Sequence, residues 1–404
     1  MEYLFTERAH LMCPHMQFGI ACLLPCECDP RTLAQTARTL AECHPFLRSL
    51  LYYDAEKHAY AYRVTEQPQT EILCREAEVT GIADPEITVE MNCLTAREWD
   101  LTREGMLKIA AWKAGGKTCL LFVFHHLLAD GRGAFGLVRE FVDCAVRGIL
   151  PARVPETLIA KADLPRGSEL PAVSRLLVHR ANRQWAKENH VLTYEKYLDF
   201  ADRWLSADTV NRSVREIGER ELAETVAECR ANGVSVNDWL MAQMFLTEGA
   251  DKIVMAADLR EKLPNYRAGA LGNYATAFSV EYKKKAADVF AAAKDVHRLT
   301  RKITETPKSL WLVLQCYAEL NGDLLDAAFA AAQGGFASRA ASFIGTVFFG
   351  FGCAGGYSVT NLGKFECETI EAACFLPPAS PAMKKTQGVL TLNGKAVICT
   401  AARP

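Results

Sequence analysis

The chain has almost no net charge. Its 404 residues include 46 Lys and Arg against 48 Asp and Glu, which gives a formal net charge of −2. A chain so balanced lacks the positive field that nucleic-acid phosphates or anionic lipid surfaces require. We therefore expect no nucleic-acid partner.

Long hydrophobic runs are also missing. The longest apolar stretches, "TCLLFVF" and "TVFFGFGCAGG", fall well short of the ~20 residues that a membrane-spanning helix needs. The first residues, "MEYLFTERAHLMCPHM", have neither the basic segment nor the long apolar segment of a signal peptide. These absences predict a cytoplasmic protein with no membrane span.

Cysteine, by contrast, is abundant. The count of fifteen is odd, and without an export signal it favours reduced thiols over a disulfide framework. Cys22, Cys26 and Cys28 lie close together in "ACLLPCECDP", but they lack the fourth ligand and the paired spacing of a zinc site. We interpret them as small hydrophobic side chains and expect no metal.

Strand and helix patterns alternate in the first half. "MQFGIACLL" predicts a strand, and Asp29-Pro30 caps a helix over "RTLAQTARTLAEC". The following "HPFLRSLLYY" indicates extended chain. "TCLLFVF" predicts a strand buried on both faces, and a helix follows it and ends at Gly148.

Strand and helix patterns alternate again in the second half, after residues 151–171, which show no periodicity. Helices are predicted over "ERELAETVAECRANG" and, capped by Ser235, over "VNDWLMAQMFLTEG", with further helical sequence over residues 285–342. "DKIVMAA" and "GGYSVTNLG" predict strands, and Asn393-Gly394 marks a hairpin tip. The fold class is therefore α/β, with subdomains at 1–155 and 175–404 joined by a linker at 156–174.

The stretch "FVFHHLLADGRG" places His125 and His126, two of only nine histidines, where the buried strand ends. An imidazole can take a proton from a hydroxyl or amine near neutral pH. Adjacent residues point to opposite faces of a strand, so only one of the two can be the base. The alternative is a pair of structural loop histidines, which the full His-His-x-x-x-Asp-Gly string makes improbable.

Asp130 follows in the same loop, and Gly131 permits the tight backbone that begins the next helix. A buried carboxylate needs a cation or several N–H donors. Asp130 therefore either completes a triad with His126 or holds the loop through an arginine. No G-x-S-x-G stretch occurs in the chain, which suggests that the substrate itself is the nucleophile.

The "HHLLADG" string resembles the HHxxxDG motif of the chloramphenicol acetyltransferase-like superfamily, which includes condensation domains, alcohol acetyltransferases and wax ester synthases. The similarity extends over nearly the whole chain in order and spacing. The weaker matches are "DPRTLAQTARTLAECHPFLRSLLYY", "REWDLTREGMLKIA", "GVSVNDWLMAQMF", "AADLRE", "LGNYATAF" and "SVTNLGKF". The resemblance implies two similar α/β subdomains with a tunnel between them.

The resemblance also implies roles for single residues. His126 would be the general base that deprotonates an alcohol or amine attacking an acyl thioester, without an acyl-enzyme. Asp130 would pair with Arg260 of the other subdomain, and Gly131 would let the loop turn. Asn273 and Asn361 would line the channel, although turn chemistry is an equal alternative for both. Arg260 would otherwise be a surface arginine.

The resemblance further implies a free-standing acyltransferase with no tightly bound cofactor. Its co-substrate would be a coenzyme A thioester, and its acceptor a small alcohol or amine. The plant acyltransferase signature DFGWG is absent. Two alternatives stay open: a condensation catalyst that takes thioesters from an acyl or peptidyl carrier protein, and a non-catalytic recruitment module of the same fold.

Overall fold

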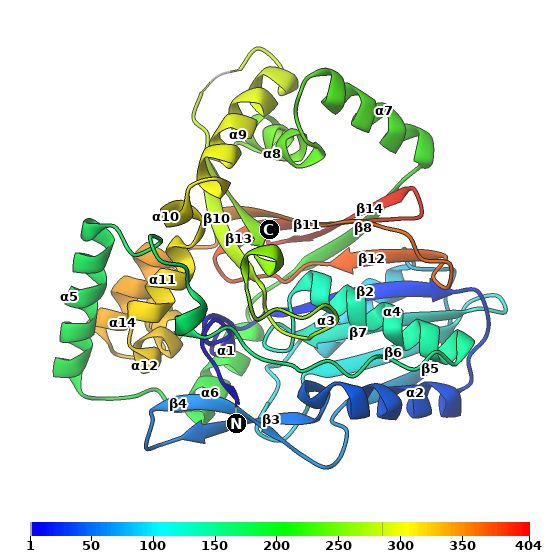
Figure 1. Ribbon diagram of the computed structural model, residues 1–404, viewed down its shortest axis with the longest axis horizontal. Coiled ribbons are helices and arrows are strands. Elements are labelled where there is room, and N and C mark those ends of the chain that lie inside the picture. Colours follow the sequence, from blue (N-terminus) through cyan, green and yellow to red (C-terminus); the bar gives the residue numbers. More distant parts are fainter. Residues whose placement is uncertain (1, 285) are drawn as a thin grey trace.

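The computed structural model describes residues 2–284 and 286–404 (Figure 1). A five-stranded sheet lies at the centre of the molecule and has the strand order β12-β2-β7-β6-β5. Its strands are β2 (Gln17–Leu24), β5 (Glu71–Glu78), β6 (Leu107–Lys113), β7 (Thr118–His125) and β12 (Ala372–Leu376). Every residue of β7 is buried, as the continuous apolar run predicts for a central strand. The predicted strands at β2 and β7 are confirmed.

Two helices of the first half begin at capping aspartates. The side chain of Asp29 accepts the main-chain N–H groups of Arg31 and Thr32, so α2 (Pro30–Cys43) begins where the sequence predicts. Helix α4 (Gly131–Arg147) ends at Gly148, whose φ of +67° suits a residue without a side chain. Two shorter helices are α1 (Arg8–Leu11) and α3 (Pro85–Leu94).

The extended chain predicted after α2 is wrong in its first half. Pro45–Arg48 form a single 3₁₀ turn, and strand β3 (Ser49–Asp54) starts only after it. Proline at the first helical position favours such a turn because its φ is already helical. β3 belongs to a small sheet of order β1-β4-β3, with β1 (Glu2–Tyr3) and β4 (Ala59–Val64).

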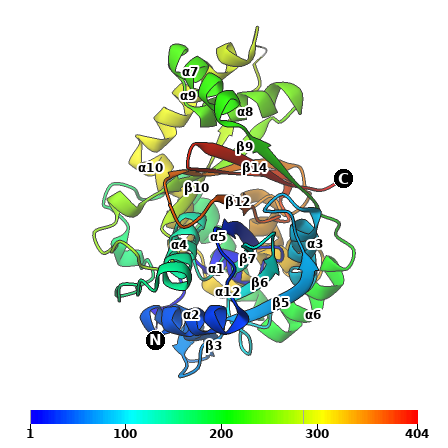
Figure 2. The ribbon, with the colours of Figure 1, turned by 90° about the vertical axis from the view of Figure 1, so that its right-hand side faces the viewer.

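A six-stranded sheet lies above the five-stranded one, with helices on its far side (Figures 1 and 2). Along its strand β13, Val389 packs against these helices, whereas Leu390 joins the core shared with the first half of the chain. This alternation places the sheet between two hydrophobic cores. The strands are β8 (Asn211–Ile217), β9 (Lys252–Asp258), β10 (Ala275–Glu281), β11 (Gly356–Phe365), β13 (Met383–Leu392) and β14 (Lys395–Ala402).

The predicted hairpin between β13 and β14 is confirmed. Leu392 pairs with Lys395, and the two turn residues between them, Asn393 and Gly394, have φ values of +49° and +79°. Two successive residues with positive φ define the turn that matches the twist of the strands. Helices α7 (Glu219–Ala231), α8 (Val236–Thr247) and α9 (Val289–Thr304) cover the sheet (Figure 2), and Ser235 caps α8 as expected.

A helical group fills one end of the molecule, on the left in Figure 1. It combines α5 and α6 with short helices from the alanine-rich sequence predicted over residues 285–342; residue 285 lies outside the described part. Their bounds are α5 (Ala172–Glu188), α6 (Tyr194–Leu205), α10 (Pro307–Leu310), α11 (Leu312–Glu319), α12 (Gly322–Asp326), α13 (Ala328–Ala332) and α14 (Arg339–Phe343).

The two halves of the chain share structure. Strand β12, which lies late in the sequence, pairs antiparallel with β2, with Ala372 opposite Leu23 and Leu376 opposite Gly19. Side chains of α5 and α6 belong to the same hydrophobic core as β2 and β7. The boundaries at residues 155 and 175 stay a prediction. The main-chain hydrogen bonds between β12 and β2 join the two halves of the chain.

No helix among residues 2–284 and 286–404 is both long and apolar enough to cross a bilayer.

Candidate active site

The site lies where β7 ends and the chain turns toward α4. The main-chain N–H of His125 donates to the carbonyl of Met106 at 2.9 Å, and that of His126 donates to Met16 at 3.2 Å. The N–H groups of His125 and His126 therefore bind two different segments, one on each side of the chain. The two imidazoles accordingly point in different directions.

His125 points into the core. Its side chain is fully buried, and Nδ1 accepts the main-chain N–H of Leu127 at 3.3 Å. Nε2 consequently carries the proton and faces the carboxylate of Glu98 at 3.5 Å, which is long for a hydrogen bond. That carboxylate accepts Gln17 Nε2 at 3.0 Å and the Tyr197 hydroxyl at 3.2 Å. His125 is therefore part of a buried polar network.

His126 is only partly buried, and its tautomer follows from its contacts. Nδ1 lies 2.9 Å from Oδ1 of Asn273. The amide nitrogen of Asn273 donates to the carbonyls of His126 at 2.8 Å and Leu127 at 3.3 Å, which identifies Oδ1 as the acceptor. Nδ1 must then carry the proton, so the lone pair resides on Nε2. Burial lowers the pKa of His126 and keeps the ring neutral near pH 7.

Two aromatic rings hold the His126 imidazole. His10 stacks on it with ring centroids 4.1 Å apart and an interplanar angle of 19°. Phe18 presents its edge at 5.3 Å and 73°. Burial lowers the pKa of His10 far below its usual value, so this neighbour is neutral and does not repel a proton on His126.

Asp130 organises the loop after the histidines. Its Oδ1 accepts the N–H groups of Arg132 at 3.1 Å and Gly133 at 3.0 Å, as the N-cap of α4. The same oxygen takes Nη2 of Arg260 at 2.8 Å, and Oδ2 accepts the N–H of Tyr274 at 2.8 Å. Both oxygens are thus used for structure, and the carboxylate links α4 to the second half.

The predicted residues Asp130 and Arg260 therefore lie together, with side chains 7% and 11% exposed. A surface position for Arg260 is excluded by this burial. Asp130 also caps α4, a role that was not predicted although an Asp directly before a helical pattern is a capping signal.

Gly131 acts differently from the expectation of a tight turn. It is the first residue of α4 and has no positive φ. A Cβ at this position would lie 2.5 Å from Cδ2 of Leu362 on β11. A side chain here would force Leu362 to shift, because the second half of the chain approaches the backbone closely at this point.

Asn361 lies on β11 and immediately precedes Leu362, the residue that approaches Gly131. Its Nδ2 donates to Oδ1 of Asn237 on α8 at 2.8 Å, and its Oδ1 accepts the N–H of Gly363 at 2.9 Å. No hydrogen bond links it to His126 or Asn273 within the described part of the chain. Of the two predicted asparagines, the structure brings only Asn273 to the imidazole.

Sequence reasoning missed two further residues, His10 and Glu98. His10 stands in "TERAHLM", which carries no pattern that separates it from surface residues. His10 stacks on His126 and Glu98 faces His125 through contacts between separate segments of the chain, and such contacts leave no local trace in the sequence.

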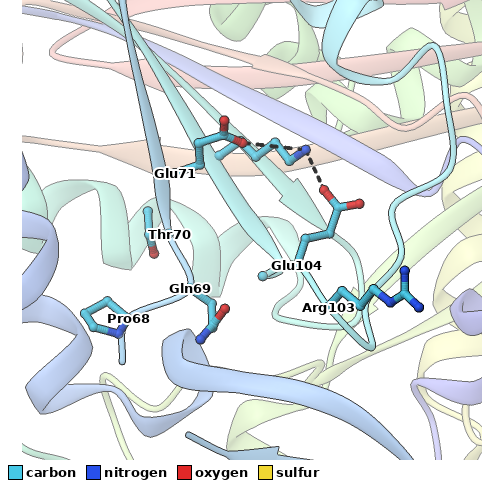
Figure 3. Close-up of a pocket in the computed structure, with 8 residues that line it drawn as sticks. Pro68, Gln69, Thr70, Glu71, Arg103 and Glu104 are labelled. Carbon is cyan, nitrogen blue, oxygen red and sulfur yellow. Dashed lines mark hydrogen bonds and ion pairs between the residues drawn. The ribbon is translucent and has the colours of Figure 1, made fainter. Parts of the chain in front are cut away.

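Two surface hollows stand apart from this site. The smaller, about 240 Å³, is lined by residues 68–71, 103–105 and 108; Figure 3 shows Glu71 and Glu104 beside it. The ammonium of Lys108 lies 3.8 Å from the Glu71 carboxylate and 2.8 Å from the Glu104 carboxylate, so these three charged groups in the hollow pair with one another. The larger, about 880 Å³, lies between α5 and α14. His126 lines neither, and the tunnel stays a prediction.

No family model matches the chain, and no curated protein matches it. Solved structures do. The first condensation domain of the calcium-dependent antibiotic synthetase, in complex with a substrate analogue, is 14% identical over 100% of this chain and 92% of its own, with a TM-score of 0.60. The chain has the condensation-domain fold.

Two other solved structures also match over the whole chain. Polyketide synthase associated protein 5 from Mycobacterium tuberculosis is 16% identical and covers 100% of this chain and 93% of its own, with a TM-score of 0.57. A mutant starter condensation domain of rhizomide synthetase RzmA, in complex with C8-CoA and Leu-SNAC, is 11% identical over 100% and 89%, with a TM-score of 0.58. The expected fold class, two chloramphenicol-acetyltransferase-like subdomains, is confirmed.

Proposed function

We propose that this protein transfers an acyl group from a thioester to an alcohol or amine, with His126 as the general base. The observation that carries this proposal is the contact of His126 Nδ1 with Asn273 Oδ1, from which the tautomer of His126 follows. Oδ1 of Asn273 lies 2.9 Å from Nδ1 of His126 and accepts the proton on that nitrogen. Nε2 is therefore free to accept a proton from the acceptor substrate. The condensation-domain fold supports the proposal, because solved structures with that fold are complexes with C8-CoA and with a substrate analogue.

The reaction needs no nucleophile from the protein. The acceptor's oxygen or nitrogen attacks the thioester carbonyl while Nε2 of His126 takes its proton, and a C–O or C–N bond forms. The tetrahedral oxyanion then collapses and the C–S bond breaks. The departing thiolate takes the proton from the imidazolium and leaves as a thiol, which restores neutral His126. This sequence uses no bound cofactor or metal.

The remaining predicted residues act indirectly in this proposal. Asp130 and Arg260 keep the His126 loop attached to the second half of the chain, and Gly131 allows that half to approach. Asn361 stays a proposed channel residue. Its side chain contacts Asn237 on α8.

The donor we propose is acyl-CoA. The complex of the mutant rhizomide synthetase domain with C8-CoA supports this choice of donor. A carrier-protein thioester is the alternative donor for the same chemistry, and the assay separates the two.

The test measures thiol release from acyl-CoA thioesters and from the same acyl groups on a phosphopantetheinylated carrier protein, against a panel of alcohols and amines. His126→Ala is expected to lower kcat by about a hundred- to ten-thousandfold. His179→Ala, which removes an exposed histidine on α5, is the matched control and should keep wild-type turnover. Wild-type turnover by His126→Ala would show that another group is the base.

A further inference from the structure

The short helix α1 places His10 against the candidate base. The imidazoles of His10 and His126 have ring centroids 4.1 Å apart and an interplanar angle of 19°, so the two rings lie face to face. A nearly parallel arrangement at this distance is favourable for aromatic rings. Phe18 approaches the His126 ring at 5.3 Å and 73°, edge to face. Of these two neighbours, His10 is the one that lies parallel to the imidazole.

Two ion pairs fix α1 beside the site. The guanidinium of Arg8 binds Asp323 at 3.1 Å and also binds Asp326, and both carboxylates belong to α12. All three side chains are buried, where ions in solution screen their attraction only weakly. His10 lies two residues further along the same short helix. The fold of the N-terminal segment therefore holds the stacked ring in place.

His10 contributes its aromatic face to the site rather than its nitrogens. Its Nδ1 is buried and has no hydrogen-bond partner in the described part of the chain. Burial and the nearby histidines His126 and His125 hold the pKa of His10 well below its usual value, so the ring is neutral near pH 7. The face of a neutral aromatic ring carries partial negative charge. His10 therefore turns a weakly negative surface toward His126.

We propose, on the basis of the acyl-transfer function proposed above, that His10 is a positioning residue: its ring keeps the His126 imidazole in place and stabilises the imidazolium that forms when Nε2 takes the acceptor's proton. An aromatic face attracts a cation within about 6 Å of its centre, most strongly where water is excluded. The attraction grows as His126 becomes charged, so it lowers the barrier of proton transfer more than it stabilises the resting site. His10 itself takes no proton in this reaction.

Other titratable groups surround the stacked pair. They are His125, Asp130, Arg260 and Tyr62 near the His126 loop, and Glu7, Arg8, Asp323 and Asp326 near α1. Asp130 is paired with Arg260 at 2.8 Å. Burial raises the pKa of Glu7 to about 7, and its carboxyl accepts the Thr6 hydroxyl at 3.0 Å. Substitutions at His10 leave all of these groups in place, so a change in the titration of His126 reports on the stacked ring.

The first test measures the pKa of His126 from its imidazole ¹⁵N shifts in the substrate-free protein. His10→Leu keeps an apolar side chain of similar volume, which excludes water, but it has no aromatic face. We expect the pKa of His126 to fall by about one pH unit in this variant, as for the loss of a desolvated cation–aromatic contact. His10→Phe restores an aromatic face and should recover most of the shift. His179→Leu, at an exposed position on α5, is the control and should titrate like the wild type.

The second test is the pH profile of kcat. The rate rises with pH as His126 loses its proton, so the lower pKa in His10→Leu should move this rise about one pH unit toward acid. The plateau should fall about three- to tenfold because the base is weaker, with KM unchanged. A purely structural role of His10 would lower the amount of active protein without moving the pH of the rise. His10→Phe should restore much of the plateau.

The two proposals fail in different ways. If His10→Leu folds and its ¹⁵N titration superimposes on that of the wild type, or if His10→Phe shows the same loss as His10→Leu, the role of His10 is refuted, while acyl transfer by His126 stands. Should His10→Leu fail to fold, His10→Gln, which also lacks an aromatic face, takes its place in both tests. If His126→Ala keeps full activity, the proposed function is refuted, and the ¹⁵N titration still reports whether the stack stabilises the charged ring.

Discussion

His44 allows a test of the ion pairs that connect the linker at residues 156–174 with α4. Its Nδ1 lies 2.7 Å from Glu156 Oε1, and its Nε2 lies 2.7 Å from Glu140 Oε2. Both ring nitrogens therefore donate to carboxylates, so the ring carries a positive charge. Burial lowers the pKa of His44, but the hydrogen bonds to the two glutamates outweigh it and raise the pKa to about 9.

The energy follows from the pKa difference between the folded and unfolded states. An unfolded histidine titrates near its ordinary pKa of 6.5, and one pH unit of difference is worth about 1.4 kcal/mol, so the charged ring stabilises the fold by about 3 kcal/mol. Because the folded-state pKa is raised, this stability is fully present below pH 6.5 and is lost as pH rises through about 9.

The assay is urea unfolding of wild type and His44→Gln between pH 6 and pH 10. The free energy of unfolding should differ by about 3 kcal/mol at pH 6, and the difference should shrink toward zero above pH 9. His179→Gln is the control, since this histidine is exposed on α5. A His44→Gln difference that stays constant across this range would refute the reasoning.

Two further substitutions test the contacts between the halves of the chain. Gly131→Ala should lower the free energy of unfolding by about 1–3 kcal/mol because its Cβ would meet Leu362 at 2.5 Å; adding Leu362→Ala should remove that clash, and a fully stable Gly131→Ala would contradict it. Arg260→Met should cost about 3 kcal/mol, since it leaves Asp130 buried without its cation, whereas Asp130→Asn in the same background should recover part of that loss in thermal unfolding.

The local elements could be predicted from the sequence because their causes are local. Asp29 caps α2 through N–H groups two and three residues away, and Asn393-Gly394 form their turn within the hairpin itself. A continuous apolar run likewise identified β7, and apolar periodicity identified the helix after it. The Pro45–Arg48 turn was missed because a short apolar run with a proline fits either state.

Of the candidate site, the sequence by itself determined the loop: a buried strand that ends in His125-His126, followed by Asp130 and Gly131. The tertiary structure decided which imidazole has a free Nε2, since that depends on Asn273, 147 residues away. It also stacked His10 on the His126 ring and paired β12 with β2. Backbone hydrogen bonds and apolar periodicity act over a few residues and can be read from neighbours, whereas these contacts depend on the path of the whole chain.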